Sequence, residues 1–327
     1  MKALIVCQAG VGVGLGHLSR SLVIAKMIQV RFCAEVSLLI QSEPLRREDI
    51  SVFRHRFIPP EQDLARQVEA DSPVDLMVFD LHPQRIPNRL EEVIKVLRSA
   101  GTKVIAVDGL LKFRPVLDLI FIPSFHFNRS AGLQQERATI LYGWDCFLLD
   151  VEQKHTAWTP GLRVLTLTGG SDATYLGATW PSLLDAHLAT DVTLDWVTGP
   201  FAKNPSFPKV PRIKIVEHVA PTSLGTLMQQ ANYAVTVFGV SFFELLYLGV
   251  PTVVFSPYGG KDNAELSVIA ESGVALVATD EHAATEELVG LMHNDTLARQ
   301  LSVQARAKLN VPGIRRLESA IADLMVN

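Results

Sequence analysis

The sequence predicts an α/β protein made of two doubly wound domains that face a cleft. Short β-branched runs alternate with amphipathic stretches along almost all of the 327 residues, a pattern typical of parallel sheets covered by helices. The length suits about two domains. A glycine-rich turn follows an apolar run in each half, which places a ligand site at the carboxyl ends of the strands.

The elements follow in order along the chain. In the first half, helical patterns such as 17–30 and 88–100 separate the expected strands, which are 2–7, 35–40, 76–80, 103–107, 119–122 and 139–141. In the second half the expected strands are 163–168, 192–197, 212–216, 233–237, 252–255 and 274–277.

Two polar segments interrupt this alternation. Residues 150–161 carry Pro160 and are typical of a linker, whereas the four prolines within 199–211 indicate a rigid loop. We therefore expect a first domain over 1–149, a linker over 150–161, and a second domain over 162–327. This division leaves the last helix able to pack back on the first domain.

Composition indicates a cytoplasmic protein that acts on a small molecule. A net charge of −4 gives no reason to expect a nucleic-acid or anionic-membrane partner, and it leaves the oligomeric state open. The three cysteines form no CxxC pair, which fits a reducing compartment, and the N-terminus lacks the pattern of a secretory signal. The apolar stretch 235–255 contains Glu244 and Pro251, so strand–turn–helix–strand explains it better than membrane insertion.

The first glycine turn, residues 10–17, ends in a histidine. It matches neither the dinucleotide fingerprint nor a P-loop, but Gly14 and Gly16 would let a sugar or phosphate approach the main chain. His17 would begin the next helix, whose positive end disfavours imidazolium, so we expect a neutral imidazole suited to a general base. The alternative is a capping or packing histidine. Arg20 shares its face and is either a substrate contact or a surface arginine.

Other polar residues of the first half lie at strand ends or alone. Asp80 and Asp108 each end a predicted strand, where a carboxylate would bind sugar hydroxyls or cap a helix. His82, His126 and His218 are scattered without metal-ligand spacing, so we interpret them as structural or surface residues and expect no metal site.

In the second half, the predicted strand 163–168 leads into a phosphate-approach loop that contains Gly170 and Ser171. Asp172 would either accept a ligand hydroxyl or cap the next helix.

A second glycine turn, residues 238–241, leads into a helix that contains Glu244 among aromatic and aliphatic neighbours. Ser241 and Glu244 have the spacing of a capping box. The alternative is functional, because a carboxylate among apolar side chains needs a partner, and a ribose diol would provide one.

Taken together, these motifs resemble the UDP-sugar hydrolases of pseudaminic acid biosynthesis and the related spore-coat polysaccharide proteins, which are relatives of nucleotide-sugar glycosyltransferases with the GT-B fold. The likeness covers nearly the whole chain. It is carried by residues 14–20, 104–108, 142–149, 169–172, 239–244 with Gly249 and Pro251, and 262–264.

The resemblance implies two Rossmann-like domains with a division of labour. The second would bind UDP, with Glu244 on the ribose and Phe238, Gly239, Val240 and Ser241 near the phosphates. Asp262 and Asn263 would lie near the sugar or diphosphate. His17 would activate water for inverting attack at the anomeric carbon, with no metal and no cofactor. The chain departs from the family in having Asp108-Gly109-Leu110 in place of Asp-Asp-Leu, His82 at an aromatic position, and no glutamine shortly before Asn263.

The leading hypothesis is therefore a hydrolase of a UDP-amino sugar that releases UDP and free sugar, in surface polysaccharide or nonulosonic acid biosynthesis. The alternative is a GT-B glycosyltransferase that delivers the sugar of a UDP-sugar to an alcohol. A nucleotide-sugar-binding subunit without chemistry is a third interpretation, and the imperfect fingerprint makes an oxidoreductase the weakest.

Overall fold

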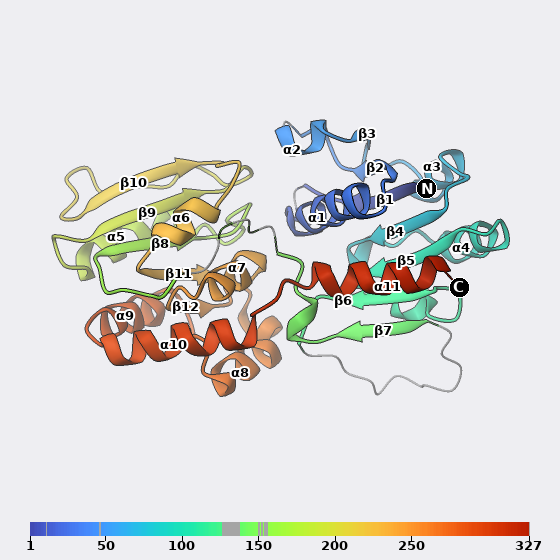
Figure 1. Ribbon diagram of the computed structural model, residues 1–327. Helices are drawn as coiled ribbons and strands as arrows, with labels where there is room; N and C mark the ends of the chain where they lie inside the picture. The colour runs from blue at the N-terminus through green and yellow to red at the C-terminus, as the bar shows by residue number, and fades with distance from the viewer. Residues whose placement is uncertain are drawn as a thin grey trace. The chain divides into compact units, whose positions relative to one another are not determined.

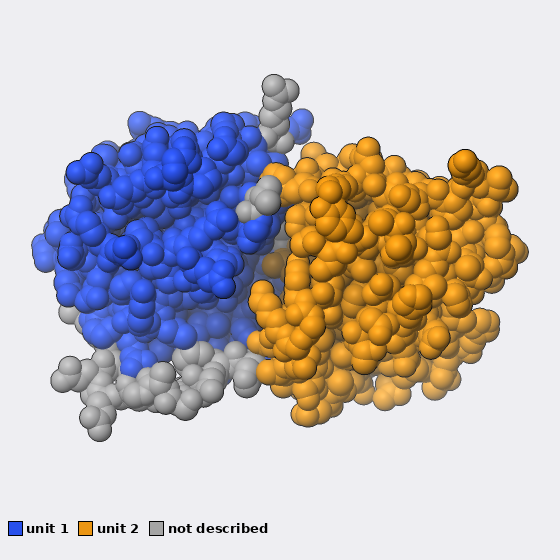
Figure 2. All heavy atoms as spheres, turned by 180° about the vertical axis from the view of Figure 1, so that it is seen from behind, with its two compact units in different colours: residues 1–150, 311–327 blue, residues 151–310 orange. Residues whose placement is uncertain are grey.

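The chain folds into two compact units, coloured separately in Figure 2. In this computed structural model the described residues are 1–10, 12–45, 47–125, 138–149, 151, 153 and 156–326. Unit 1 comprises Met1–Asp150 together with Val311–Asn327, and unit 2 comprises Val151–Asn310. His126, interpreted from the sequence as a structural or surface residue, lies outside the described residues.

Unit 1 is built on a seven-stranded parallel sheet in the order β3-β2-β1-β4-β5-β6-β7 (Figure 1). Its strands are β1 (Lys2–Gln8), β2 (Glu35–Gln41), β3 (Arg54–Ile58), β4 (Leu76–Asp80), β5 (Lys103–Val107), β6 (Leu119–Ile122) and β7 (Thr139–Tyr142). The prediction missed β3, which is an edge strand. Its first three residues are exposed and basic, because an edge strand tolerates charges that discourage pairing with other chains.

Helices cover both faces of this sheet, and side chains alternate between two apolar cores. Ile5 of β1 joins one core and Val6 joins the other. The C-terminal helix α11 (Ile314–Val326) contributes Leu317 and Ile321 to the first core and packs against α1 (Gly16–Arg31). The helices are α1 (Gly16–Arg31), α2 (Glu48–Ser51), α3 (Leu64–Ala70), α4 (Leu90–Ser99) and α11 (Ile314–Val326), with short 3₁₀ turns η1 (Pro83–Arg85), η2 (Leu111–Phe113) and η3 (Trp144–Cys146).

Unit 2 repeats the arrangement with a six-stranded parallel sheet in the order β10-β9-β8-β11-β12-β13. Its strands are β8 (Arg163–Leu167), β9 (Thr193–Thr198), β10 (Lys214–Val219), β11 (Tyr233–Val237), β12 (Thr252–Phe255) and β13 (Leu276–Val277). Its helices are η4 (Leu176–Ala178), α5 (Trp180–His187), α6 (Gly225–Gln230), α7 (Val240–Leu248), η5 (Gly259–Asp262), α8 (Asn263–Ser272), α9 (Glu281–Met292) and α10 (Asp295–Lys308).

Both sheets reverse their strand order at an equivalent place, between β1 and β4 in unit 1 and between β8 and β11 in unit 2. In open parallel sheets such a switch point opens a crevice at the carboxyl ends of the strands, and ligands bind there. The predicted class of two doubly wound α/β sheets is thus confirmed. No helix among the described residues is long and apolar enough to cross a bilayer.

Candidate functional site

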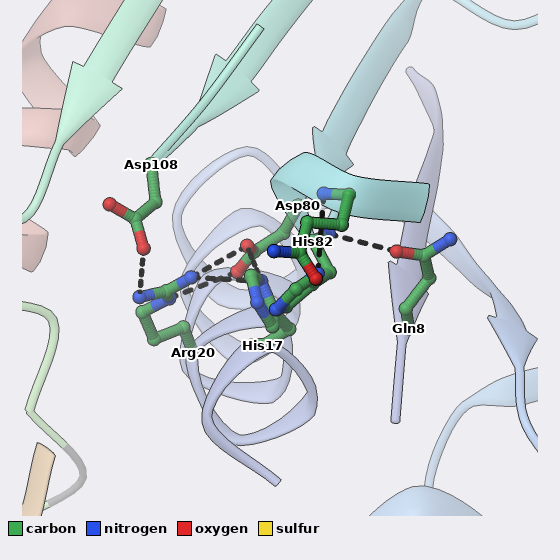
Figure 3. A network of polar contacts seen from close by, with 7 residues as sticks. Gln8, His17, Arg20, Asp80, His82 and Asp108 are labelled. Atoms are coloured by element: carbon green, nitrogen blue, oxygen red, sulfur yellow. Dashed lines mark hydrogen bonds and ion pairs between the residues drawn. The ribbon is translucent and has the colours of Figure 1, made fainter. Parts of the chain in front are cut away.

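A histidine and an aspartate meet at the switch point of unit 1 (Figure 3). His17 is the second residue of α1, and Asp80 is the last residue of β4. Nδ1 of His17 lies 2.5 Å from Oδ1 of Asp80, although 63 positions separate them in sequence. His17 is 8% exposed and Asp80 is fully buried. The fold thus brings together two residues that the sequence singled out separately.

The glycine turn before α1 places His17 here. Gly10, Gly12 and Gly14 all have positive φ, at 113°, 79° and 78°. Hydrogen bonds in both directions between Gly10 and Gly14 close the turn, and α1 begins at Gly16. The alternating glycines are therefore required by the backbone conformation of the turn itself, and not only by the close approach of a ligand.

Arg20 lies one helical turn after His17 and faces the same carboxylate. Its Nε is 3.1 Å from Oδ2 of Asp80 and its Nη2 is 2.8 Å from Oδ1, so the guanidinium grips both oxygens. Its Nη1 donates to Oδ2 of Asp108 at 2.7 Å. Arg20 is 9% exposed, and its guanidinium links the carboxylates of Asp80 and Asp108. The residue interpreted from the sequence as a substrate contact or a surface arginine is thus a buried partner of two aspartates.

The contacts of Asp80 fix its charge. Burial alone would raise the pKa of this carboxyl, but the charge of Arg20 and the hydrogen bonds from His17 and Arg20 outweigh burial and hold the pKa below its ordinary value. Both oxygens are occupied within the protein, so the geometry gives no support to the predicted contact of Asp80 with sugar hydroxyls. An ionised carboxylate only accepts hydrogen bonds, so Nδ1 of His17 donates to Asp80 and Nε2 is the ring nitrogen outside this hydrogen bond.

Asp108 follows β5, the next strand of the sheet. Its backbone lies in the left-handed region with φ of 59°, an uncommon conformation for a residue other than glycine, which aspartate tolerates better than most. Its side chain is 36% exposed and is paired with Arg20. Among the predicted carboxylates of unit 1, Asp108 therefore retains an accessible surface, which is compatible with a ligand contact.

Polar residues surround this dyad; the sequence singled out His82 as a structural or surface residue, but gave no indication of Gln8 and Gln41. The ring of His82 packs edge-on against that of His17, with centroids 5.9 Å apart. Gln8 is buried and accepts from the backbone N–H of His82 at 2.8 Å, while its amide donates to Gln41 at 2.8 Å. The available signal was their position, since Gln8 and Gln41 end adjacent strands as Asp80 does.

At the switch point of unit 2, the loop after β8 carries the predicted residues Gly170, Ser171 and Asp172. The Asp172 carboxylate accepts from the N–H groups of Leu176 and Gly177 at 2.9 and 2.8 Å. This is the capping role that the sequence left open, and it orders the loop rather than offering the carboxylate to a ligand. Ser171 remains half-buried at the edge of the sheet.

Of the two interpretations of the second glycine turn, the structure contradicts the Ser241–Glu244 capping box. Gly239 is the N-cap of α7, and none of the described side chains provides a cap hydrogen bond. Ser241 is the second residue inside the helix, so the predicted Ser241–Glu244 capping box does not form. Val240 begins the helix, and Phe238 stacks edge-on with Phe243 beside it. Glu244 is 9% exposed, so its carboxylate is buried on a helix whose other buried residues are apolar.

The last predicted pair lies after β12. The Asp262 carboxylate is hydrogen-bonded to Ser256, and Asn263 is the exposed first residue of α8. Burial raises the pKa of Tyr258, and the charges of Asp262 and Asp172 raise it further. In the described part of the chain, no group of three His, Cys, Asp or Glu side chains is arranged to hold a metal ion.

Comparisons with known proteins define the fold. No family model and no curated protein matches the chain. Among solved structures, MurG of Acinetobacter baumannii is 15% identical with a TM-score of 0.64, covering 99% of this chain and 100% of its own. UGT2 of Phytolacca americana, complexed with UDP-2fluoro-glucose and pterostilbene, is 13% identical with a TM-score of 0.65 over 99% and 100%. MnaA of S. aureus, with UDP, is 12% identical with a TM-score of 0.61 over 97% and 95%. The chain therefore has the GT-B fold, with two Rossmann-like domains.

Proposed function

We propose that this protein is an inverting, metal-independent glycosyltransferase that takes its sugar from a nucleotide sugar, most simply a UDP-sugar. The His17–Asp80 dyad carries this proposal, because it presents a basic Nε2 at a ligand-binding switch point. The solved structures of similar fold favour sugar transfer, since they include a calicheamicin glycosyltransferase and UGT2 complexed with UDP-2fluoro-glucose and pterostilbene.

In the proposed reaction, Nε2 of His17 takes the proton of an acceptor hydroxyl while the hydroxyl oxygen attacks the anomeric carbon. The bond from that carbon to the β-phosphate oxygen breaks, and UDP departs with the electron pair. Asp80 stabilises the imidazolium that forms and holds the ring in one orientation. Attack on the face opposite the leaving group inverts the anomeric configuration.

Unit 2 would hold the nucleotide. The N-terminus of α7 presents backbone N–H groups beside Gly239, which suits a diphosphate and would stabilise the departing charge without a metal. Glu244 remains the proposed ribose ligand, with Phe238, Val240 and Ser241 near the phosphates. Ser171 with Gly170, and Asp262 with Asn263, are proposed to contact the sugar or the diphosphate. In unit 1, Gly14, Gly16 and Asp108 would contact the acceptor side.

Hydrolysis of a UDP-amino sugar is the second candidate. The sequence run from Gly14 to Arg20 and its companion motifs favour it, because they resemble those of UDP-sugar hydrolases. In that case the same dyad would deprotonate water. Cytoplasmic surface-polysaccharide biosynthesis remains the proposed setting for either reaction.

The test is a screen of UDP-, CMP- and GDP-sugars with and without alcohol acceptors, in which products are resolved as free sugar or glycoside. We expect UDP release that depends on an alcohol and falls about 10²- to 10⁴-fold in His17→Gln. Acceptor-independent release of free sugar would instead establish hydrolysis. Nucleotide binding without turnover of any donor would leave a binding protein and remove the enzyme proposal.

A further inference from the structure

Arg20 contacts both members of the His17–Asp80 dyad, which a residue that only bound substrate would not need to do. Its Nη2 shares Oδ1 of Asp80 with His17, at 2.8 Å against 2.5 Å. The same Nη2 lies 3.0 Å from Nδ1 of His17. Since both nitrogens carry hydrogens when Asp80 is ionised, this last approach is a contact between donors that converge on one oxygen.

The charges around His17 are nearly balanced. Arg20 supplies one positive charge, and Asp80 and Asp108 supply one negative charge each, which leaves one negative charge in excess. Uptake of a proton by His17 would complete the balance. Two other titratable groups face the pair. Burial raises the pKa of the Cys7 thiol to about 12, which keeps it neutral, and His82 packs against the His17 ring.

We propose that Arg20 is a positioning residue that sets the tautomer and the proton affinity of His17 by holding Asp80 as a doubly bonded, ionised carboxylate. Its two-pronged contact fixes the plane of the carboxylate, so that Oδ1 faces Nδ1. Its charge also offsets one of the two carboxylates. Without it, two carboxylates would face His17 with no compensating cation, so the His17–Asp80 pair would hold its proton more tightly.

Arg20 therefore has two separable effects, one of charge and one of geometry. Arg20→Lys keeps the charge but loses the planar fork, whereas Arg20→Gln loses both. Asp108→Asn removes the second carboxylate and should act in the opposite direction to Arg20→Gln. The matched control is Arg56→Gln, because Arg56 is also paired with an aspartate, Asp71, but lies on the exposed edge strand β3.

The experiment is a pH titration of the histidine imidazoles by ¹H–¹⁵N NMR in the ligand-free protein, with His17→Gln to assign the signals. We expect wild-type His17 to be protonated at Nδ1 and unprotonated at Nε2. Proton uptake should move up by about one pH unit or more in Arg20→Gln and down in Asp108→Asn. It should stay near the wild-type value in Arg20→Lys and be unchanged in Arg56→Gln.

Although the catalytic meaning of Arg20 rests on the proposed function, this titration needs no substrate. An Nε2–H tautomer in the wild type, or an unchanged titration in Arg20→Gln, would overturn the inference even if the enzyme is a transferase. If no donor is turned over, the proposed function fails while the titration still decides the role of Arg20. Should Arg20→Gln not fold, Arg20→Lys decides it, because the inference requires proton uptake near the wild-type value together with loss of the fixed Nδ1–H tautomer. A retained tautomer in Arg20→Lys would overturn the role of the fork.

Where turnover is found, the acid limb of kcat/KM gives a second readout. It should move to higher pH in Arg20→Gln. In Arg20→Lys, kcat should fall while the acid limb stays in place. Equal losses in both variants with an unmoved acid limb would show a merely structural arginine.

Discussion

The two units share a topology but place different chemistry at equivalent positions. At the switch point of unit 1, charged side chains from α1, β4 and the end of β5 bond to one another. At the switch point of unit 2, the carboxylate of Asp172 accepts from backbone N–H groups of its own loop, and the N-cap of α7 is the uncharged Gly239. One edge carries a network of bonded charged side chains, and the other carries a helix N-terminus without a side-chain cap.

This difference shows that the doubly wound fold supplies a location, while the loops supply the chemistry. Parallel strands bring residues distant in sequence to one edge in either unit. A buried ion network costs desolvation and is retained where its charges have a use, whereas backbone N–H groups bind a diphosphate without any side-chain charge. The following predictions test this contrast.

The largest expected effect is on turnover in Asp80→Asn. An amide at this position offers a poorer acceptor to Nδ1 and stabilises the imidazolium less, so we expect kcat to fall about 10²- to 10⁴-fold. Nucleotide affinity should be retained, because the proposed nucleotide site belongs to unit 2. Steady-state kinetics and calorimetric titration with UDP would check this. A parallel loss of UDP affinity would contradict the division of labour.

Asp80 should also govern the acid stability of unit 1. Because its pKa is lower in the folded than in the unfolded chain, the stability it contributes is fully present above about pH 4 and is lost as pH falls through the folded pKa. Asp80→Asn should therefore lower the free energy of unfolding by about 3 kcal/mol near neutrality, and the difference should shrink with acidification. Urea unfolding at several pH values measures it. A difference independent of pH would show that packing, and not charge, is lost.

In unit 2, substitutions at two glycines, Gly239 and Gly249, should separate an effect on UDP binding from an effect on the stability of the protein. Gly239 has φ of 169°, which any residue adopts, and an added Cβ would meet no described atom within 4 Å. Aspartate is also a good N-cap, so Gly239→Asp should keep or raise stability while its charge weakens UDP binding about tenfold or more.

The control is Gly249→Ala at the other end of α7. Gly249 has φ of 74°, and an added Cβ would lie 2.7 Å from Cδ of Arg306. We expect a loss of about 1 kcal/mol or more in stability with UDP affinity retained. Thermal unfolding and UDP titration of both variants provide the comparison. Unaltered UDP binding in Gly239→Asp would remove the α7 terminus from the nucleotide site.

Sequence alone could predict features whose signal is local. The β-branched runs gave β4, β5 and β6 with the bounds that the structure shows, and the glycine turn located the start of α1 to within one residue. Strand β3 was not predicted because its sequence has no apolar pattern: its first three residues, Arg54, His55 and Arg56, are polar and exposed. Only the last two residues of this edge strand are partly or fully buried.

The residues of the candidate site could be predicted from the sequence, but the hydrogen bonds and ion pairs between them could not. Asp80, Asp108 and His17 were each singled out by position, yet their contacts depend on the strand order, which places β4 beside β1 and β5 beside β4. A single sequence does not state that order. The role of Arg20 changed for the same reason, since its two carboxylate partners lie 60 and 88 positions away.

The smallest expected effect concerns Ser241, where sequence and structure disagree within a single turn of helix. A capping box would make Ser241 the N-cap, and its replacement by alanine would cost about 1 kcal/mol. In the structure Gly239 is the N-cap and Ser241 lies inside α7, so Ser241→Ala should change the free energy of unfolding by less than about 0.5 kcal/mol. Urea unfolding of the variant at neutral pH decides between the two values. The full capping cost would mean that α7 begins two residues later, and the N–H groups proposed to face the diphosphate would then be covered by the serine hydroxyl.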